Sequence, residues 1–302
     1  MSLLVVGTVA FDAVETPHGK VARMLGGAAT YAAVAASYFA PVRLVAVVGE
    51  DFTARDHSIF RGRPIDTSGL EHVPGRSFFW SGKYTPDMND RTTLDTQLNV
   101  LADFDPKLPE AYRDSPFVFL GNIQPSLQLR VLRQLRRKPR LVAMDTMNYW
   151  IEGALSDLRA VLRHVHVLVI NDSEARQLSG RHNLVQAAAR IQTMGPKAVV
   201  IKRGEHGATL FRGHQVFAAP AMPLHHVCDP TGAGDSFAGG FMGSLTAAGK
   251  VDDASLRRAM IHGSVMGSFA VEKFGLERLR RLTRKQIHAR AQRFHNITRF
   301  TL

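Results

Sequence analysis

The stretch DPTGAGDSF, residues 229–237, leads directly into a segment with helical periodicity. Apolar residues recur at helical spacing along it and predict a helix over 233–249, which places the glycines at the helix N-terminus. Backbone N–H groups lack intrahelical partners at such an end, and the helix dipole adds positive potential there. The stretch therefore predicts an anion site. Its backbone amides would come from Gly232, Ala233 and Gly234.

Asp235 lies in the first turn of this predicted helix. A carboxylate there suits the helix dipole, but it competes with a bound anion. A base that takes a proton beside a phosphate would resolve the conflict. The structural alternative is a capping turn that binds nothing, because Asp and Thr are common where helices begin.

The composition is that of a globular protein with a core. The chain has 302 residues, 45% of them hydrophobic, which is enough for one large α/β domain or two ordinary ones. The single cysteine, Cys228, excludes an intrachain disulfide and a thiolate zinc site. The first nine residues carry no basic leader, and no run of about eighteen apolar residues occurs. We therefore expect a cytoplasmic protein that does not contact membranes.

The formal charge is +12, from 38 Lys and Arg against 26 Asp and Glu, and the excess is concentrated near the C-terminus. Such a block could bind nucleic acid or attract anionic substrates. We favour a solvated helix face without a nucleic-acid partner, because aromatic residues are sparse there and no nucleic-acid motif is present. The basic residues are Arg278, Arg280, Arg281, Arg284, Lys285, Arg290, Arg293 and Arg299.

Strand and helix patterns alternate along much of the chain. Residues 3–7 and 42–48 read as buried strands, and from residue 117 onward short apolar runs alternate with helical segments. Repeated βα units predict a mostly parallel sheet covered by helices on both faces. Asp12 follows the first strand, where ligands of open sheets collect, so it could hold sugar hydroxyls or simply form a turn.

The pattern changes between residues 77 and 104, where aromatic and polar residues alternate without a long helix. Together with residues 13–24, this segment predicts a small β lid over the substrate cleft of a single domain spanning 1–302. Lids of this kind exclude water from phosphoryl transfer. Exposed aromatic residues in the lid would also favour a homodimer. The aromatic residues concerned are Phe78, Phe79, Trp80 and Tyr84.

The stretch 229–237 resembles the C-terminal signature Asp-x-Thr-Gly-Ala-Gly-Asp of the ribokinase-like (PfkB) family of carbohydrate and nucleoside kinases. The resemblance implies a three-layer α/β/α sandwich with a mostly parallel central sheet and a β-sheet lid. In that family the Gly-Ala-Gly amides form an anion hole and the last Asp is the catalytic base. The matching residues here are Gly232, Ala233, Gly234 and Asp235.

The acceptor side of the resemblance lies near the N-terminus. Gly26 and Gly27 match a family glycine pair that contacts substrate, and the family counterpart of Asp12 holds sugar hydroxyls. Tyr31 stands where an Asn is common, so it would either stack on a ring of the acceptor or narrow the pocket. Two further residues at predicted strand ends are expected to contact the acceptor, namely Asn122 and Asn148.

The nucleotide side is carried by two short motifs. Asn171 to Glu174 resembles the family's Asn-x-x-Glu motif, which would hold Mg²⁺ of Mg–ATP through water. A helix cap is the structural alternative. Residues 202–207 resemble the Thr-x-Gly-x-x-Gly turn beside the nucleotide phosphates, with a lysine in place of the hydroxyl residue. The residues expected to contact ATP are Asn171, Glu174, Lys202, Arg203, Gly204, Gly207 and Thr231.

The sequence predicts an ATP-dependent kinase that phosphorylates a primary hydroxyl group of a sugar. A nucleoside kinase, in which Tyr31 or a lid aromatic stacks on the base, is the alternative, and a catalytically silent binding module ranks third. Walker-type and protein-kinase motifs are absent from the sequence. A potassium ion near Asp229 and Thr231 is a further expectation.

Overall fold

The computed structural model describes residues 1–299 and 301. In this part of the chain nine strands form one sheet, and the seven from β11 to β5 run parallel while β12 and β13 add antiparallel pairs at one edge. The strands in their order across the sheet are β13 (Gln215–Ala219), β12 (Ala208–Arg212), β11 (Ala198–Lys202), β10 (Val167–Asn171), β9 (Leu141–Met144), β8 (Phe117–Leu120), β1 (Leu3–Val6), β4 (Val42–Val48) and β5 (Ile65–His72).

Successive residues of each central strand face opposite helix layers. In β1, Leu3 and Val5 belong to one apolar cluster, while Leu4 belongs with Val6 to the other, and all four are fully buried. Side chains alternate across a strand, so a strand that is apolar throughout requires cover on both faces. The structure thus confirms the predicted parallel sheet between two helix layers.

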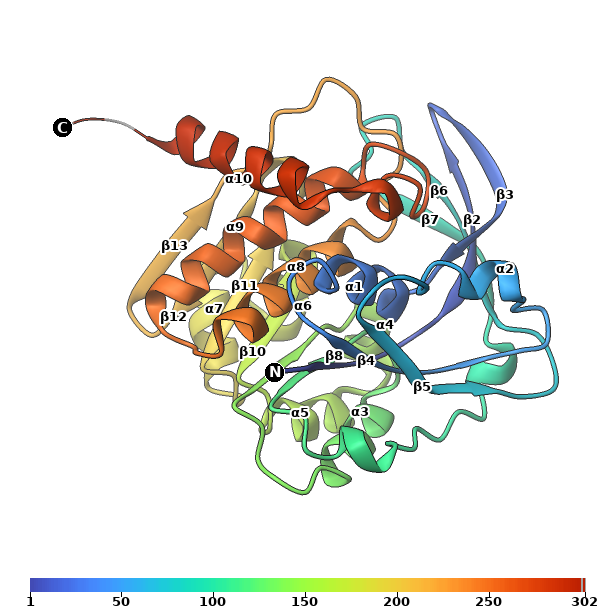
Figure 1. Cartoon of the computed structure of the whole chain (residues 1–302). Coiled ribbons are helices and arrows are strands. Elements are labelled where there is room, and N and C mark those ends of the chain that lie inside the picture. Colours follow the sequence, from blue (N-terminus) through green and yellow to red (C-terminus); the bar gives the residue numbers. More distant parts are fainter. Residues whose placement is uncertain (300, 302) are drawn as a thin grey trace.

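Helices on one side of the sheet form a layer around the helix that follows the glycine-rich stretch (Figure 1). That layer contains α1 (Ala28–Ala36), α8 (Ala233–Ala248), α9 (Asp253–Ala270) and α10 (Arg284–Thr298). The opposite layer contains α3 (Pro125–Arg133), α4 (Asn148–Gly153), α5 (Leu155–Leu162), α6 (Asp172–Ser179) and α7 (Leu184–Gln192). Shorter elements are α2 (Ala54–His57) and the 3₁₀ turns at Asn99–Leu101, Glu110–Tyr112, Gly204–His206 and Leu279–Arg281.

A second sheet of four strands stands at one end of the molecule (Figure 1). Its strands in order are β3 (Gly19–Gly26), β2 (Ala10–Thr16), β6 (Phe78–Tyr84) and β7 (Arg91–Gln97). The chain enters it twice, first between β1 and α1 and again after β5. We call this sheet the lid, because its hairpin β6–β7 reaches the N-terminus of α8, as described below.

Several elements differ from the sequence predictions. Asp12 lies within strand β2 of the lid, not in a turn after β1. Helix α4 and the hairpin β12–β13 were not predicted. The lid aromatics are not exposed: Tyr84 is buried, and Phe78, Phe79 and Trp80 are half-buried. That expectation was wrong because alternate residues of β6 face either the site or the molecule's core.

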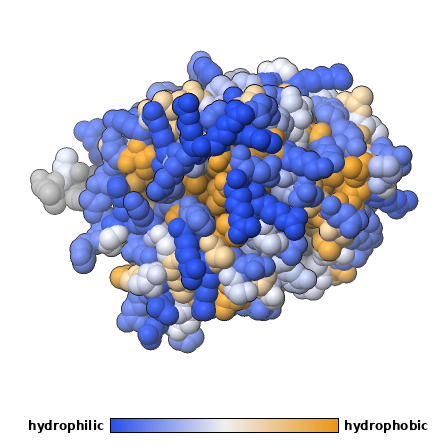
Figure 2. Space-filling model, turned by 90° about the horizontal axis from the view of Figure 1, so that it is seen from below, coloured by the Kyte–Doolittle hydropathy of each residue, from blue (hydrophilic) through white to orange (hydrophobic). Residues whose placement is uncertain are grey.

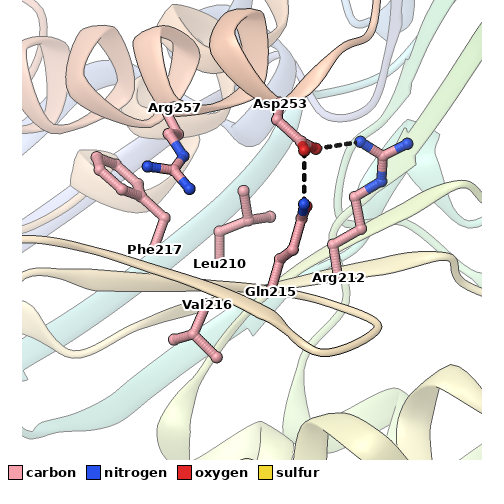
Figure 3. A pocket seen from close by; sticks show the side chains of 7 residues that line it. All are labelled: Leu210, Arg212, Gln215, Val216, Phe217, Asp253 and Arg257. Carbon is pink, nitrogen blue, oxygen red and sulfur yellow. Dashed lines mark hydrogen bonds and ion pairs between the residues drawn. The ribbon is translucent and has the colours of Figure 1, made fainter.

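The hairpin β12–β13 is fastened to α9 by polar contacts around a small hollow (Figure 3). Asp253 accepts a bond from Arg212 at 2.6 Å and one from Gln215 at 2.7 Å. Nearby, Arg257 lies over the ring of Phe217, with its guanidinium carbon 5.4 Å from the centroid. The hollow encloses about 10 Å³, which is too small for a ligand. It is therefore part of the hairpin's attachment to α9.

The basic C-terminal segment is partly structural. Glu272, just after α9, accepts bonds from Arg278 at 2.7 Å and from Arg290 of α10 at 2.5 Å. Both guanidinium groups also lie over the ring of Phe269, at 5.0 and 3.5 Å from its centroid. Two of the eight basic residues are therefore part of the packing between α9 and α10.

Long hydrophilic side chains dominate the side of the molecule beneath α3 and α5, with apolar areas scattered between them (Figure 2). The exposed residues of these helices and their ends include Arg130, Arg133, Arg159 and Arg163. Within residues 1–299 and 301, no helix has both the length and the apolar character needed to cross a bilayer.

Replacing Glu272 with Gln should destabilise the protein by about 1–3 kcal/mol, because the change removes the charge that pairs with two half-buried guanidinium groups. Urea denaturation followed by circular dichroism measures this difference. Glu277→Gln is the matched control, since Glu277 is exposed and forms no ion pair within the described chain. Equal stability of the two variants would contradict a packing role for Glu272.

Candidate active site

The N-terminus of α8 begins at Gly232, which adopts a left-handed conformation with φ of 73°. A side chain there would be strained, and its Cβ would also lie 2.4 Å from the ring of Tyr31. The N–H groups of Gly232 and Gly234 have no hydrogen-bond acceptor among the described residues, whereas that of Ala233 donates to Pro230 O at 3.1 Å. Two of the three predicted amides are therefore available to an anion, and the amide of Ala233 is not.

Asp229 holds the turn that precedes α8. Its carboxylate is fully buried and accepts the N–H of Thr231 at 2.9 Å and the N–H of Gly275 at 3.0 Å. Gly275 follows α9, so this carboxylate links the two neighbouring helices of the layer. Both of its oxygens are thus occupied by backbone donors.

Asp235 is half-buried in the first turn of α8. Burial, and next the charge of Asp145, raise the pKa of Asp235 to about 6, while the positive charges of Lys202 and Arg91 act in the opposite direction. A carboxylate with such a pKa is ionised at pH 7 and is a stronger base than an ordinary aspartate.

Asp12 lies on β2 with its carboxylate against the backbone of Gly26, where an added Cβ would come within 1.9 Å of Oδ2. Gly27, with φ of 92°, begins α1 and approaches Thr8 so closely that a Cβ would lie 2.5 Å from its carbonyl oxygen. The absence of side chains at Gly26 and Gly27 therefore allows the carboxylate of Asp12 and the first residue of α1 to lie close to the backbone. Burial, then the charges of Asp229 and Asp235, raise the pKa of Asp12 to about 7.

Lys202 ends β11 and points toward α8. Its Nζ lies 3.5 Å from Asp145 Oδ2, and a Cβ on Gly234 would lie 2.8 Å from the same Nζ. Burial alone would lower the pKa of Lys202, but the carboxylates of Asp145, Glu174 and Asp235 together raise it above its usual range. The ammonium group is therefore charged and lies beside the two available amides.

Asn171 and Glu174 form a capping box at the start of α6. The side chain of Asn171 accepts the N–H of Glu174 at 2.7 Å, and Glu174 accepts the N–H of Asn171 at 2.8 Å. This is the structural alternative considered for the motif, and it leaves Oε1 of Glu174 without a donor among residues 1–299 and 301. Burial, and next the charge of Asp145, raise the pKa of Glu174 to about 7.

The lid hairpin spans the site. Tyr84 accepts a hydrogen bond from Thr231 Oγ1 at 3.2 Å, just before α8. At the hairpin tip, Asn89 donates to Glu205 at 3.5 Å, within the turn expected to border the nucleotide. The lid therefore contacts both the glycine-rich stretch and the second glycine turn.

The second glycine turn, residues 203–207, is shaped by its own contacts. Gly204 and Gly207 have φ of 52° and 81°, and a Cβ on Gly207 would lie 2.1 Å from Ala219 O. Arg203 donates to His206 O at 3.1 Å within the same turn, so its guanidinium folds back onto the backbone. Of the two basic residues predicted to supply charge, Lys202 points toward α8.

Asn122 and Asn148 are not brought to this group of residues by any polar contact in the described chain. Asn122 accepts the indole N–H of Trp150 at 3.0 Å and donates to Met147 at 3.0 Å. Asn148 donates to Gln177 of α6. Their contact with an acceptor stays a prediction.

Tyr31 is 1% exposed, and its hydroxyl finds no hydrogen-bond partner among the described residues. One face of its ring is covered by Gly232, so the ring does not offer that face to a ligand. Of the two roles considered for Tyr31, narrowing the pocket fits this position better than stacking.

Four residues of the site were not among the predicted site residues. Asp145 directly follows β9, where the sequence does not distinguish it from other polar residues at strand ends, although it pairs with Lys202. Trp80, Tyr84 and Arg91 are contributed by the lid, and the strand register aligns Tyr84 with Arg91. Alternation along β6 could have placed Trp80 and Tyr84 on one face, but which face looks at α8 depends on tertiary contacts.

A family model described as pfkB family carbohydrate kinase matches residues 2–280 of the chain. The chain belongs to the pfkB family of carbohydrate kinases. It is 31% identical over 248 residues to the cytidine kinase of Thermococcus kodakarensis, covering 80% of this chain and 87% of that protein. The chain is therefore a carbohydrate or nucleoside kinase, and the resemblance seen in its motifs is confirmed.

Solved structures of a nucleoside kinase and of a riboside kinase have the same fold. The nucleoside kinase of Burkholderia thailandensis in complex with inosine matches with a TM-score of 0.77 at 20% identity, over 97% of this chain and 99% of that one. The aminoimidazole riboside kinase of Salmonella enterica, complexed with aminoimidazole riboside and an ATP analog, matches with a TM-score of 0.74 at 21% identity, over 96% and 100%. The ribokinase-like sandwich is thereby confirmed.

Replacing Asp12 with Asn should stabilise this pfkB kinase in the absence of substrates. The folded protein holds the pKa of Asp12 near 7, above its ordinary value of 3.8, so ionisation costs stability progressively as pH rises between these values. The variant should match the wild type near pH 4 and exceed its free energy of unfolding by about 1–4 kcal/mol at pH 8.

Urea denaturation at several pH values measures this difference, with Asp103→Asn, at an exposed position, as control. A gap between Asp12→Asn and wild type that does not grow with pH would contradict the assigned burial of charge.

Proposed function

We propose that this chain transfers the γ-phosphoryl group of ATP to a primary hydroxyl group of a nucleoside. The observation that carries the proposal is the convergence of Asp235, two available amides and Lys202 at the N-terminus of α8, beside Asp12. The relation to a cytidine kinase over most of both chains supports a nucleoside acceptor over the sugar expected from the motifs. A sugar acceptor remains the second candidate, because the family description is carbohydrate kinase.

Asp12 would accept hydrogen bonds from the sugar hydroxyls of the acceptor, with Gly26 and Gly27 allowing the sugar to approach the backbone. Asp235 would then take the proton of the primary hydroxyl as its oxygen attacks the γ-phosphorus and ADP departs. General-base help of this kind contributes roughly 10²–10⁴ in rate. The raised pKa of Asp235 suits it to that task at neutral pH.

The amides of Gly232 and Gly234 would donate to the transferring phosphoryl group, and the ammonium of Lys202 would balance its charge. A well-placed donor of this kind contributes about 3–4 kcal/mol in comparable sites. Glu174 and Asn171 are the residues that would hold Mg²⁺ through water, and their oxygen atoms suit that ion. Bound Mg²⁺ supplies charge neutralisation at the phosphates. Gly204, Gly207 and Thr231 would border the same phosphates.

The silent-module alternative is disfavoured by the electrostatics of the site. Four acidic side chains, those of Asp12, Asp145, Glu174 and Asp235, have pKa values raised first of all by burial. Burying several acidic groups lowers the free energy of unfolding, and groups with shifted pKa values of this kind cluster at catalytic sites.

Other expectations from the sequence stay predictions. They are a single domain over 1–302, a homodimer through the lid, a cytoplasmic location, the absence of a nucleic-acid partner and activation by a monovalent cation near Asp229 and Thr231. For the cation, Asp229 would have to share oxygens that already accept two N–H groups.

Asp235→Asn should lower kcat by at least roughly 10²-fold while leaving the Kd for ATP nearly unchanged, because the amide cannot take the hydroxyl proton. Coupled detection of ADP gives kcat, and calorimetry gives the Kd. Asp157→Asn, at an exposed position in α5, should behave as the wild type. A kcat within tenfold of wild type in Asp235→Asn would rule out the base assignment.

Lys202→Met should raise the KM for ATP roughly 10- to 100-fold, since a charge-assisted bond to phosphate is lost. The acid limb of kcat/KM should also move to higher pH, because Lys202 lowers the pKa of Asp235. Initial rates over a range of ATP concentration and pH test both effects. Lys197→Met, at an exposed position just before β11, serves as control, and an unchanged KM for ATP in Lys202→Met would refute the assignment.

A further inference from the structure

Trp80 is a half-buried aromatic residue on the lid that the proposed phosphotransfer does not use. In the parallel pairing of β2 with β6, Trp80 is the register partner of Asp12. Register partners project from the same face of a sheet, and neighbouring strands are about 4.8 Å apart. The indole therefore starts one strand away from the carboxylate proposed to hold the sugar.

The face that carries Trp80 is the face that looks at α8. Tyr84, four residues along β6 and so on the same face, meets Thr231 through its hydroxyl. Phe79 points the opposite way, since it is the partner of Phe11 and packs against the large apolar cluster. Trp80 is thus directed into the site.

The orientation of the indole ring is fixed by two contacts. A Cβ on Gly82 would lie 2.3 Å from Cη2 and 2.4 Å from Cζ2 of Trp80, so the six-membered ring lies directly on this glycine. The indole N–H donates to Thr93 Oγ1 at 3.3 Å, and Thr93 is the partner of Gly82 across β6 and β7. The ring is therefore held along the lid before any ligand binds.

The ring is also approached by Arg91 of β7. Its guanidinium carbon lies over the ring at 5.8 Å from the centroid, near the outer limit of a cation–π contact, and Arg91 itself is exposed. Trp80 also remains partly exposed, unlike the buried Tyr31. A planar group that lies against the indole would take the place of the exposed Arg91 side chain over the ring.

We propose that Trp80 is the platform on which the base of the nucleoside stacks while Asp12 holds its sugar. A nucleoside carries its planar base beside its sugar ring, which matches the adjacent positions of Asp12 and Trp80. This inference rests on the proposed function and identifies the lid aromatic that reads the base. Tyr31, with one ring face on Gly232, is left to limit the size of the sugar subsite.

The test compares Trp80→Ala and Trp80→Phe with wild type on cytidine, on inosine and on D-ribose, which has no base. Trp80→Ala should lower kcat/KM for the nucleosides roughly 5- to 150-fold, mainly through KM, because base stacking on an aromatic side chain is lost. Trp80→Phe should retain most of the nucleoside activity. Activity on ribose should change less than threefold in either variant. Leu94→Ala, which truncates an exposed lid residue, is the control, and its activity on all three substrates should change less than threefold.

Fluorescence provides a measurement that leaves Trp80 in place. The chain has two tryptophans, so Trp150→Phe makes Trp80 the only one. Cytidine should quench the emission of this variant without ATP, and ribose should not.

Nucleoside kinase activity that survives unchanged in Trp80→Ala would overturn the stacking role and leave the proposed function intact. Equal losses on ribose and nucleosides would also overturn it, whereas a wild-type enzyme that phosphorylates ribose but no nucleoside would refute the proposed function itself.

Discussion

The structure depends on a balance of charge at the N-terminus of α8. Three acidic side chains with raised pKa values, those of Asp145, Glu174 and Asp235, surround the half-buried ammonium group of Lys202, which lies beside a helix end with two available amides. Burial favours protonation of the acids, while the ammonium and the helix dipole favour their ionisation. Glycine is required at 26 and 232, because side chains there would collide with Asp12 and with the ring of Tyr31, whereas a side chain at 234 would only displace Nζ of Lys202. The same few residues thus determine both where the side chains of the site lie and how their pKa values are shifted.

Much of the scaffold was predictable because its signals are local. The strand predicted over 42–48 has those bounds in the structure, and the helix predicted over 233–249 ends only one residue earlier, since apolar residues recur in both at the spacing of the element. The site was less predictable. Asp12 was predicted to contact the acceptor, which stays a prediction. Its place on a lid strand depends on pairing with β3, which follows a turn, and with β6, which is distant in sequence. The same holds for Trp80, whose direction is decided by register.

Charge was the property that the sequence described least well. The C-terminal basic segment reads as a solvated face when its residues are counted, yet Arg278 and Arg290 share Glu272 and the ring of Phe269. Lys202 likewise replaces a hydroxyl residue of the family motif, and only its approach to Asp145 explains how a buried lysine is tolerated. Whether a charged side chain is part of the packing depends on the residues that other helices and strands place beside it, and these are not evident from the sequence.

The placement of Asp12 on the lid, while Asp235 belongs to α8, means that the two carboxylates sit on different bodies of the fold. Under the proposed function, any motion that raises the lid would carry Asp12 away from Asp235 and leave the N-terminus of α8 facing solvent without an alcohol beside it. Selection of the acceptor and assembly of the reaction centre would then be one event, because Asp12 belongs to the same sheet as the hairpin β6–β7 that contacts the glycine-rich stretch. Loss of ATP to water would be limited for the same reason.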